Sequence, residues 1–327
     1  MNILVTGGAG YIGSHVVKAL LESGEHNITV IDNFSKGSQK ALDTLKNFGK
    51  FNFINISLED DLSEVFRSGK FDAIIHFAAF IEVFESTQNP VKYYLNNTAN
   101  VARVLGFCHK YGVNKFIFSS TAAVYGEPDV PSVDENSKTA PINPYGHSKL
   151  MSEQIIRDYA AANENFRFAI LRYFNVAGAS IDGAIGQNYP NATHLIKVAV
   201  QTALKKREKM GIYGDDYATK DGTCVRDYIH VCDLANAHIS ALNYICENKS
   251  EIFNVGYGRG FSVKEVIDVA KRVSGVNFNV ENQPRRDGDP AILIANSTKL
   301  RNLTDWTPKF DDLDLIIKTA LEWERKI

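Results

Sequence analysis

The chain has 327 residues, of which 44% are hydrophobic, and its 36 Lys and Arg residues nearly balance its 38 Asp and Glu residues, giving a formal net charge of -2. This length predicts two domains, or one large domain with an appended lobe, and the hydrophobic content excludes a disordered chain. The near-neutral charge argues against nucleic acid or an anionic membrane as the main partner, so a small molecule is the expected ligand.

No segment of the sequence has the composition of a membrane span or a secretory signal. The most apolar stretch, residues 71–84, is interrupted by three polar or charged side chains, whereas a span needs roughly 20 apolar residues. The amino terminus enters an apolar run with no basic segment before it. The cysteines lack both the density of a disulfide framework and the paired spacing of a zinc site. We therefore expect a cytoplasmic protein without a metal, in which four cysteines are small buried hydrophobes: Cys108, Cys224, Cys232 and Cys246.

Short β-branched runs alternate with segments long enough to form helices, which predicts an α/β fold with a Rossmann-like, doubly wound parallel sheet. The predicted strands are residues 3–6, 28–32, 51–56, 73–77, 116–119 and 168–173. The predicted helices are residues 11–23, 38–47, 60–68, 90–111 and 144–163. The last two helices start with Asn-Pro, so Asn89 and Asn143 are the expected caps.

After Tyr173 the sequence changes to a glycine-rich passage with weak periodicity. We place a domain boundary there, with a first domain over residues 1–175 and a smaller α/β lobe over residues 176–327. Residues 226–260, approximately, are expected to return to the first domain. The second part has one strong helical stretch at residues 194–207 and a late tryptophan-containing tail, and the chain has no internal repeat.

Three spaced glycines follow the first predicted strand and open the first predicted helix, in the run Gly7-Gly-Ala-Gly10-Tyr-Ile-Gly13. Small residues there allow a tight turn and a close approach of a pyrophosphate to backbone N–H groups, and the helix N-terminus favours negative charge. Asp32 ends the second strand about 20 residues later, where a carboxylate can bind both ribose hydroxyls. It would repel a 2′-phosphate, so NAD is favoured over NADP. The alternative to a dinucleotide site is a purely structural one, in which the glycines form a tight turn and Asp32 is a cap.

A second glycine run, Gly256-Tyr-Gly258-Arg-Gly260, lacks the third glycine spacing. We interpret it as a turn before a helix capped by Ser262.

Tyr145 and Lys149 lie one helical turn apart on one face of the helix that Pro144 begins. A free phenol, with a pKa of about 10, is a weak base at neutral pH. The lysine charge, a bound nicotinamide cation and the helix N-terminus would all favour phenolate. Ser119-Ser-Thr121 ends a predicted parallel strand, at the edge where open α/β sheets bind ligands, so a hydroxyl there could orient a substrate or relay a proton.

Together, the glycine loop, Ser119-Ser-Thr121, Tyr145-x-x-x-Lys149 and Arg172-Tyr-Phe-Asn175 resemble the extended short-chain dehydrogenase/reductases. Four longer segments are similar to those of the UDP-hexose 4-epimerases and narrow the resemblance to them: residues 118–126, 143–150, 221–231 and 285–289. The resemblance covers nearly the whole chain.

The resemblance implies that Tyr145 removes the proton of the sugar 4-hydroxyl while C4 passes hydride to tightly held NAD. The 4-keto sugar then turns over and takes the hydride back on its other face. Lys149 would hold the nicotinamide ribose, and Thr121 would take the hydroxyl role. A homodimer packed through residues 90–111 and 144–163 is also implied, and Val91, Leu95, Val101 and Leu105 would permit it.

The resemblance also assigns binding residues. Those expected at the cofactor are Gly7, Gly10, Tyr11, Ile12, Gly13, Asp32, Asn33, Ser57, Leu58, Phe77, Ala78, Ala79, Asn96, Ser119, Tyr145, Lys149 and Tyr173. Those expected at the UDP-sugar are Thr121, Tyr145, Asn175, His194, Leu195, Ile212, Tyr213, Arg226, Arg286, Asp289 and Leu293. Tyr213 could stack on uracil, and two arginines suit a pyrophosphate, although surface ion pairing is the alternative for each arginine.

Three positions differ from the commonest pattern of that family. Ile81 stands where a lysine often lies near the cofactor phosphates, Ser57 replaces an aspartate beside the adenine, and His194 replaces an asparagine next to the diphosphate. Each change could weaken cofactor or nucleotide binding.

Leu293 occupies the position that governs sugar size in such epimerases. A bulky tyrosine there excludes an N-acetyl group, so leucine predicts that UDP-N-acetylglucosamine and its galactosamine epimer are accepted as well.

Three rival functions are open at this point. A sugar-nucleotide dehydratase or decarboxylase would need acidic residues after Thr121, where Ala122 and Ala123 stand. A net dehydrogenase would accumulate NADH, whereas a reductase would consume it. A non-catalytic NAD-sensing protein has no reason to keep the three catalytic residue types together.

Overall fold

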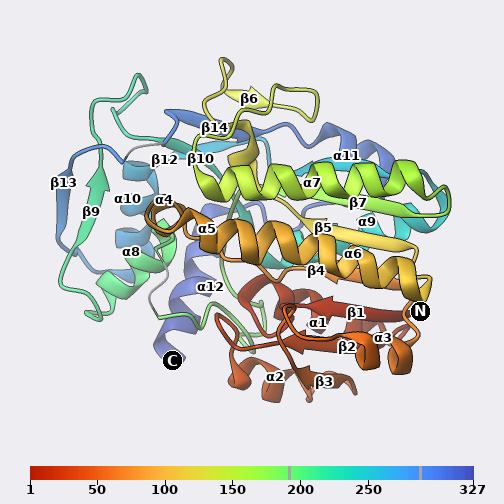
Figure 1. Ribbon diagram of the computed structural model, residues 1–327. Coiled ribbons are helices and arrows are strands. Elements are labelled where there is room, and N and C mark those ends of the chain that lie inside the picture. Colours follow the sequence, from red (N-terminus) through yellow and green to blue (C-terminus); the bar gives the residue numbers. More distant parts are fainter. Residues whose placement is uncertain (191–192, 287–288) are drawn as a thin grey trace.

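A seven-stranded, fully parallel sheet forms the centre of the fold (Figure 1). The computed structural model describes residues 1–190, 193–286 and 289–327. The strand order is β11-β7-β5-β4-β1-β2-β3, so the chain reverses its direction of winding between β1 and β4, and the predicted doubly wound α/β fold is confirmed. The strands are β1 (Asn2–Thr6), β2 (Asn27–Asp32), β3 (Asn52–Asn55), β4 (Ala73–His76), β5 (Lys115–Ser119), β7 (Arg167–Tyr173) and β11 (Glu251–Val255).

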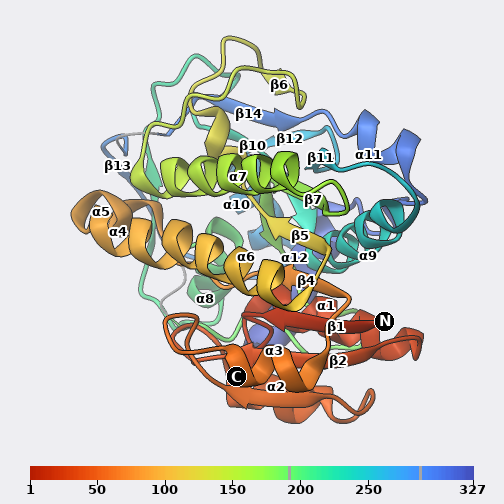
Figure 2. The same cartoon turned by 45° about the vertical axis from the view of Figure 1, so that its right-hand side comes forward.

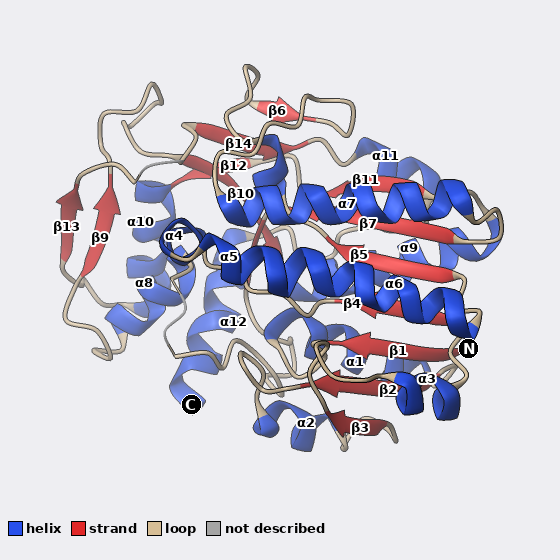
Figure 3. Ribbon diagram, viewed as in Figure 1, coloured by secondary structure: helices blue, strands red, loops and turns tan. Residues whose placement is uncertain are grey.

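Alternate residues of these strands point into two separate cores. Ile3 and Val5 of β1 pack in one core, whereas Leu4 between them packs in the other. The first core contains helices α1 (Tyr11–Ser23), α2 (Gln39–Leu45) and α9 (Val231–Glu247). The second contains α3 (Ser63–Gly69), α6 (Asn100–Tyr111) and α7 (Pro144–Ala162), of which α6 and α7 run side by side in front of the sheet in Figure 3.

A second group of elements lies beside the carboxyl ends of the central strands (Figure 2). A smaller sheet has the order β12-β10-β14-β6, with β8 paired to β10, and β9 pairs with β13. These strands are β6 (Ser132–Val133), β8 (Asn175–Ala177), β9 (Met210–Tyr213), β10 (Val225–His230), β12 (Gly260–Ser262), β13 (Val280–Gln283) and β14 (Ile292–Ala295). Helices α8 (Leu195–Ala203), α10 (Val263–Ser274) and α12 (Leu313–Lys326) pack on one another, and α11 (Thr298–Leu303) lies beside β11.

The helix caps show where local sequence decides the structure. Asn143 caps α7 as predicted, because its side chain accepts the Gly146 N–H at 2.8 Å. Ser262 caps α10 in a capping box with Glu265, also as predicted, and Gly258 with a φ of 81° makes the preceding segment a turn. Asn89 stands at the predicted cap position, directly before the helix that starts with Pro90, but its side chain makes no cap bond to any described residue. This residue also ends the preceding helix α4 (Val83–Gln88), with its N–H bonded to the Glu85 carbonyl.

Three predicted helices differ clearly from those observed. The helical stretch expected at residues 194–207 ends at Ala203 as α8, and Lys205 shortly after it has a φ of 58°, outside the helical range. The helix expected at residues 90–111 is divided into α5 (Pro90–Tyr93), a π-helical segment (Tyr94–Ala99) and α6. Within the π segment, Asn97 bonds both the N–H and the carbonyl of Phe80. The helix expected at residues 60–68 begins at Ser63, because the carboxylates of Asp60 and Asp61 accept backbone N–H groups in turns.

The cysteine prediction is correct only in part. All four cysteines are free thiols, but Cys246 is exposed and Cys232 is half-buried, since each stands on α9 away from its packed face. The domain boundaries stay a prediction. One core runs from α1 and α9 into α8, α10 and α12, so the two predicted parts share packed side chains.

Candidate active site

The glycine loop between β1 and α1 has no room for a side chain at Gly7 or Gly13. Gly7 has a φ of 71°, and a Cβ there would lie 2.7 Å from the backbone nitrogen of Ala78. A Cβ on Gly13 would overlap the carbonyl oxygen of Gly7. Helix α1 starts at Tyr11, between Gly10 and Gly13, and its first N–H groups have no partner within the helix. This cradle fits the pyrophosphate of a dinucleotide.

Asp32 lies at the end of β2 beside this loop and is buried. Its Oδ2 accepts the N–H of Ala9 at 3.0 Å, and its Oδ1 accepts the N–H of Phe34 at 2.8 Å. Burial raises the pKa of this carboxyl, while these N–H bonds oppose the rise. Each carboxylate oxygen has a second lone pair, so the group can still accept hydrogen bonds from two ribose hydroxyls. The residues present therefore fit NAD.

Tyr145 and Lys149 come from the first turns of α7 and are both buried. The Lys149 Nζ donates to the Ser119 carbonyl at the end of β5, at 2.7 Å. The side chain of Thr121 hydrogen-bonds Tyr145, and its Oγ1 also accepts the Ala123 N–H at 3.2 Å, which caps the 3₁₀ helix Ala122–Tyr125. The structure thus brings Ser119, Thr121, Tyr145 and Lys149 together at the carboxyl edge of the sheet.

Burial dominates the pKa values of this pair. It raises the pKa of Tyr145 to about 12, against the opposing effect of the Thr121 hydrogen bond. It lowers the pKa of Lys149 to about 7, against the opposing effect of the Glu153 carboxylate. From sequence we expected the surroundings to favour phenolate. With the chain's own groups alone, the cost of burying a charge outweighs the groups that favour phenolate.

His238, which sequence reasoning missed, supports Ser119 from α9. Its Nδ1 donates to the Leu234 carbonyl at 2.9 Å, so its Nε2 is the acceptor for the Ser119 hydroxyl, also at 2.9 Å. The ring lies 6.2 Å from that of Tyr173 and 4.8 Å from that of Phe77. No local motif could have indicated a contact between residues so far apart in sequence.

The remaining predicted cofactor residues follow the carboxyl ends of neighbouring strands. Phe77, Ala78 and Ala79 follow β4, and Ser57 and Leu58 follow β3. Asn96 lies in the π segment and donates to the Asn97 side chain at 2.9 Å. The loops at these strand ends also contain Gly10, Asn33 and the exposed Ile81, and Ile12 lies in the first turn of α1.

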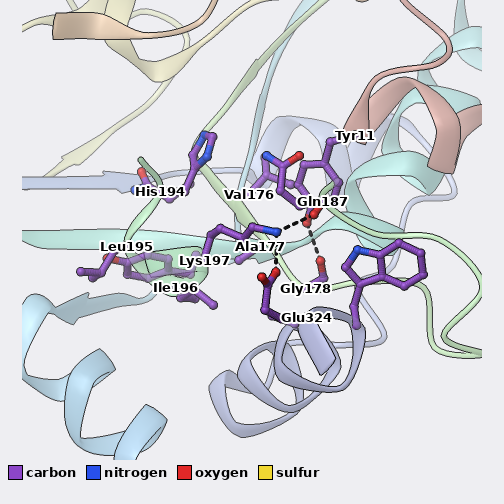
Figure 4. A pocket seen from close by; sticks show the side chains of 14 residues that line it. Tyr11, Val176, Ala177, Gly178, Gln187, His194, Leu195, Ile196, Lys197 and Glu324 are labelled. Carbon is purple, nitrogen blue, oxygen red and sulfur yellow. Dashed lines mark hydrogen bonds and ion pairs between the residues drawn. The ribbon is translucent and has the colours of Figure 1, made fainter. Parts of the chain in front are cut away.

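A pocket joins the glycine loop to the second group of elements (Figure 4). Tyr11 lines it together with Asn175, His194 and Leu195. The Tyr11 hydroxyl donates to the Gly178 carbonyl at 2.6 Å, and this bond links the two sides. One predicted cofactor residue and three predicted substrate residues are therefore neighbours.

The other predicted substrate residues form two groups. Arg226 contacts the Asp289 carboxylate, Nη2 to Oδ1, at 3.3 Å and is paired with Leu293 in the register of β10 and β14. Leu293 is buried in a cluster with Ala122 and Phe174, which directly follow Thr121 and precede Asn175 in the sequence, respectively. In the second group, the guanidinium of Arg286 lies 3.5 Å from the ring centroid of Tyr213, which follows the buried Ile212 on β9. Residues 287–288 of the predicted 285–289 motif lie outside the described residues.

The sequence profile of the NAD dependent epimerase/dehydratase family matches residues 3–256. The chain belongs to this family. It is 48% identical over 327 residues to a UDP-glucose 4-epimerase of Azospirillum brasilense, a match that covers 100% of this chain and 92% of the relative.

Two solved structures show the same full-length likeness. A UDP-Glc/GlcNAc 4-epimerase from Campylobacter jejuni is 58% identical with a TM-score of 0.88, over 99% of each chain. A UDP-glucose 4-epimerase from Bifidobacterium longum, in complex with NAD+ and UDP, is 35% identical with a TM-score of 0.95, over 99% of this chain and 98% of the other.

Among the described residues, no helix is long and apolar enough to cross a membrane. The same part of the chain contains no group of three or more His, Cys, Asp or Glu side chains that could hold a metal ion.

Proposed function

We propose that this protein is a UDP-hexose 4-epimerase that interconverts UDP-glucose and UDP-galactose with NAD as its bound cofactor. The observation that carries the proposal is the buried group of Thr121, Tyr145 and Lys149 beside the glycine loop. It occurs in a chain that is 48% identical over its whole length to a UDP-glucose 4-epimerase.

The chemistry assigned to the protein's own residues is proton transfer and positioning. Bound NAD supplies the hydride acceptor and donor at sugar C4. Tyr145 takes the proton of the 4-hydroxyl and returns it, and Thr121, hydrogen-bonded to Tyr145, orients that hydroxyl. Lys149 is held by the Ser119 carbonyl at 2.7 Å, where its charge favours the phenolate form of Tyr145 and its remaining N–H groups can bind the nicotinamide ribose.

The two groups of the second lobe would hold the nucleotide. Arg226 and Arg286 supply forked donors for the diphosphate. Asp289 pairs with Arg226, and three further predicted substrate residues line the pocket at Tyr11: Asn175, His194 and Leu195. Arg286 already covers one face of Tyr213, so the uracil would stack on the other face.

The rival dehydratase reaction lacks its second acid. Ala122 and Ala123 follow Thr121, and the nearby carboxylate of Glu153 is buried in an ion pair with Arg172 at 2.6 Å. That carboxylate therefore has a structural role and does not supply the second acid.

Both plain and N-acetylated sugars are proposed substrates. Leu293 leaves out the aromatic ring that would fill the acetyl space, and a chain 58% identical to this one is described as a UDP-Glc/GlcNAc 4-epimerase. A cytoplasmic location is also proposed, which the four free thiols support.

The assay that tests the function is incubation of the purified protein with UDP-galactose or UDP-glucose and no added cofactor. We expect interconversion without accumulation of NADH absorbance. Tyr145→Phe should lower kcat by about a hundredfold or more, because the general base is lost. Tyr111→Phe, which removes the same hydroxyl at the far end of α6, is the matched control. Full activity of Tyr145→Phe would show that another group is the base.

A homodimer through α5, the π segment and α7 is proposed as well. Val91 and Leu95 are 63% and 59% exposed on this face, which supports it. Val101 and Leu105, also expected there, are instead buried against the sheet of their own chain. Leu95→Glu should convert dimers to monomers in light scattering, whereas Leu303→Glu on α11 should not. A Leu95→Glu variant that remains dimeric, or an unsubstituted protein that is monomeric, would contradict this interface.

A further inference from the structure

The side chain of Lys36 joins three loops near the glycine loop. Its Nζ lies 2.6 Å from Oε1 of Glu82 and 2.6 Å from the hydroxyl of Tyr189. The same Nζ is 4.0 Å from the centroid of the Tyr189 ring. The side chains of Lys36 and Glu82 are 27% and 26% exposed, so this ion pair is largely shielded from solvent.

The strand order places this ion pair across the end of β1. Lys36 lies in the loop after β2, and Glu82 lies in the loop after β4. In the sheet, β1 stands between β4 and β2. A bond between the two outer loops must therefore pass over the carboxyl end of β1, where the glycine loop lies. Tyr189 adds the segment that leads to α8, so the second lobe is tied to the same point.

Each end of this bridge is fixed to the scaffold. The loop after β2 returns to the glycine loop, since Ser38 N donates to the Ala9 carbonyl at 3.0 Å. The backbone of Glu82 is held through both its N–H, at 3.1 Å, and its carbonyl, at 2.8 Å, by the hydroxyl of Tyr93. Tyr93 is fully buried. Breaking the bridge therefore requires only a movement of the Lys36 and Glu82 side chains and of the segment around Tyr189, while the backbone at both ends stays in place.

We propose that Lys36, Glu82 and Tyr189 form a clasp over the bound dinucleotide and slow its release. The inference rests on the proposed function, because an epimerase that returns the hydride must keep the same cofactor through turnover. Glu82 also interacts electrostatically with His194, so the clasp borders the predicted substrate residues.

The clasp differs from a direct contact of Lys36 with the cofactor phosphates. Burial alone would lower the pKa of Lys36, but its bonds to Glu82 and Tyr189 outweigh burial and raise it. The charge of Lys36 is thus already paired with Glu82. If the clasp acts as proposed, removing either partner speeds cofactor release. If Lys36 instead bound phosphate, removing Glu82 would free the lysine and retain the cofactor better.

The test measures NAD release from the holoenzyme. Protein purified with its cofactor is passed over a desalting column, and the NAD+ that leaves it is followed over time by reduction with excess alcohol dehydrogenase and ethanol. We expect Lys36→Met and Glu82→Gln each to release NAD at least about tenfold faster than the parent, as expected for loss of a shielded charge-assisted bond. Tyr189→Phe should have a smaller effect in the same direction. Lys46→Met, which removes the exposed pair with Asp43, is the control.

Two results would overturn the clasp. One is release at the parent's rate in both Lys36→Met and Glu82→Gln; the other is faster release in Lys36→Met alone. Circular dichroism and the thermal midpoint show whether each variant is folded, and the double exchange Lys36→Glu with Glu82→Lys should restore slow release. Epimerase activity and NAD content of the parent report separately on the proposed function, so its failure is distinguishable from failure of the clasp.

Discussion

Burial determines the protonation states from which Tyr145 and Lys149 start. Burial raises the pKa of Tyr145 to about 12 and lowers the pKa of Lys149 to about 7, so burial opposes the charged form of both side chains. Tyr145 can act as a base only when positive charge beside it favours the phenolate. The charge of Lys149, which Glu153 supports, and that of the cofactor are therefore needed together.

Leu293 carries the prediction about substrate size. It is 7% exposed and packs with Ala122 and Phe174 beside Thr121. Leu293→Tyr would place a ring in the acetyl space, so turnover of UDP-N-acetylglucosamine should fall about tenfold or more relative to UDP-glucose. The measurement is kcat/KM for both sugars, with Leu303→Tyr as the control. An unchanged ratio of the two values would contradict the assignment.

At the scale of single residues, the sequence reveals groups that share a short motif. The glycine loop, Asp32 and the Tyr145–Lys149 pair are visible because their spacing reflects one turn or one strand–helix unit. His238 and Lys36 were not predictable, since their partners are 119 and 46 residues away. Such contacts depend on how strands are ordered in the sheet.

Helix α7 is joined to two strands of the sheet through one buried carboxylate. Glu153 accepts the Ser120 hydroxyl at 2.5 Å and both Nε and Nη2 of Arg172, with the shortest contact at 2.6 Å. Arg172 continues to the hydroxyl of Tyr125 at 3.1 Å. The network aligns the helix of Tyr145 with the strand end of Thr121, so it positions the side chains that we propose to be catalytic.

Glu153→Gln should destabilise the protein by about 3 kcal/mol, because the buried guanidinium of Arg172 loses its countercharge. The measurement is the free energy of unfolding from urea titration. Glu64→Gln is the matched control: its pair with Arg67 is 75% and 65% exposed, and its loss should cost less than about 0.5 kcal/mol. Equal effects of the two changes would mean that burial does not increase the contribution of the Glu153–Arg172 pair to stability.

Elements with strong local signals were predictable, and those made by distant pairing were not. The caps of α7 and α10 follow from Asn143 and Ser262, which satisfy N–H groups of their own helices. The strands of the second lobe have two to six residues, and several pair with remote segments, such as β6 with β14 and β8 with β10. A short run has too little periodicity to be recognised.

For the whole molecule, buried histidines predict loss of stability in mild acid. Burial lowers the pKa of His15 and His238 to about 4 and that of His76 and His230 to about 3. Their ordinary pKa is 6.5, so below that pH the unfolded chain binds protons that the folded chain does not. Each histidine then lowers stability by about 1.4 kcal/mol per pH unit until its folded pKa is reached.

Asp227 acts in the opposite direction. Burial raises its pKa to about 6, so the folded chain takes up a proton first, and this offsets one histidine between pH 6 and about 4. Unfolding free energies measured at pH 7.5, 6.5 and 5.5 should fall slightly between the first two values and much more between the second and the third. An unfolding free energy that does not change with pH would contradict the conclusion that the buried histidines are neutral in the folded chain.

The position of β11 has a consequence for synthesis of the chain. This strand completes the sheet beside β7, and α9 just before it covers the sheet and supplies His238 to Ser119. A ribosome adds about 5–20 residues per second, so on the order of ten seconds pass between emergence of Tyr173 and of Val255. During that interval the nascent first half exposes the apolar edge and face that α9 and β11 later cover. Chaperones that recognise apolar segments therefore have a defined window in which to bind this chain.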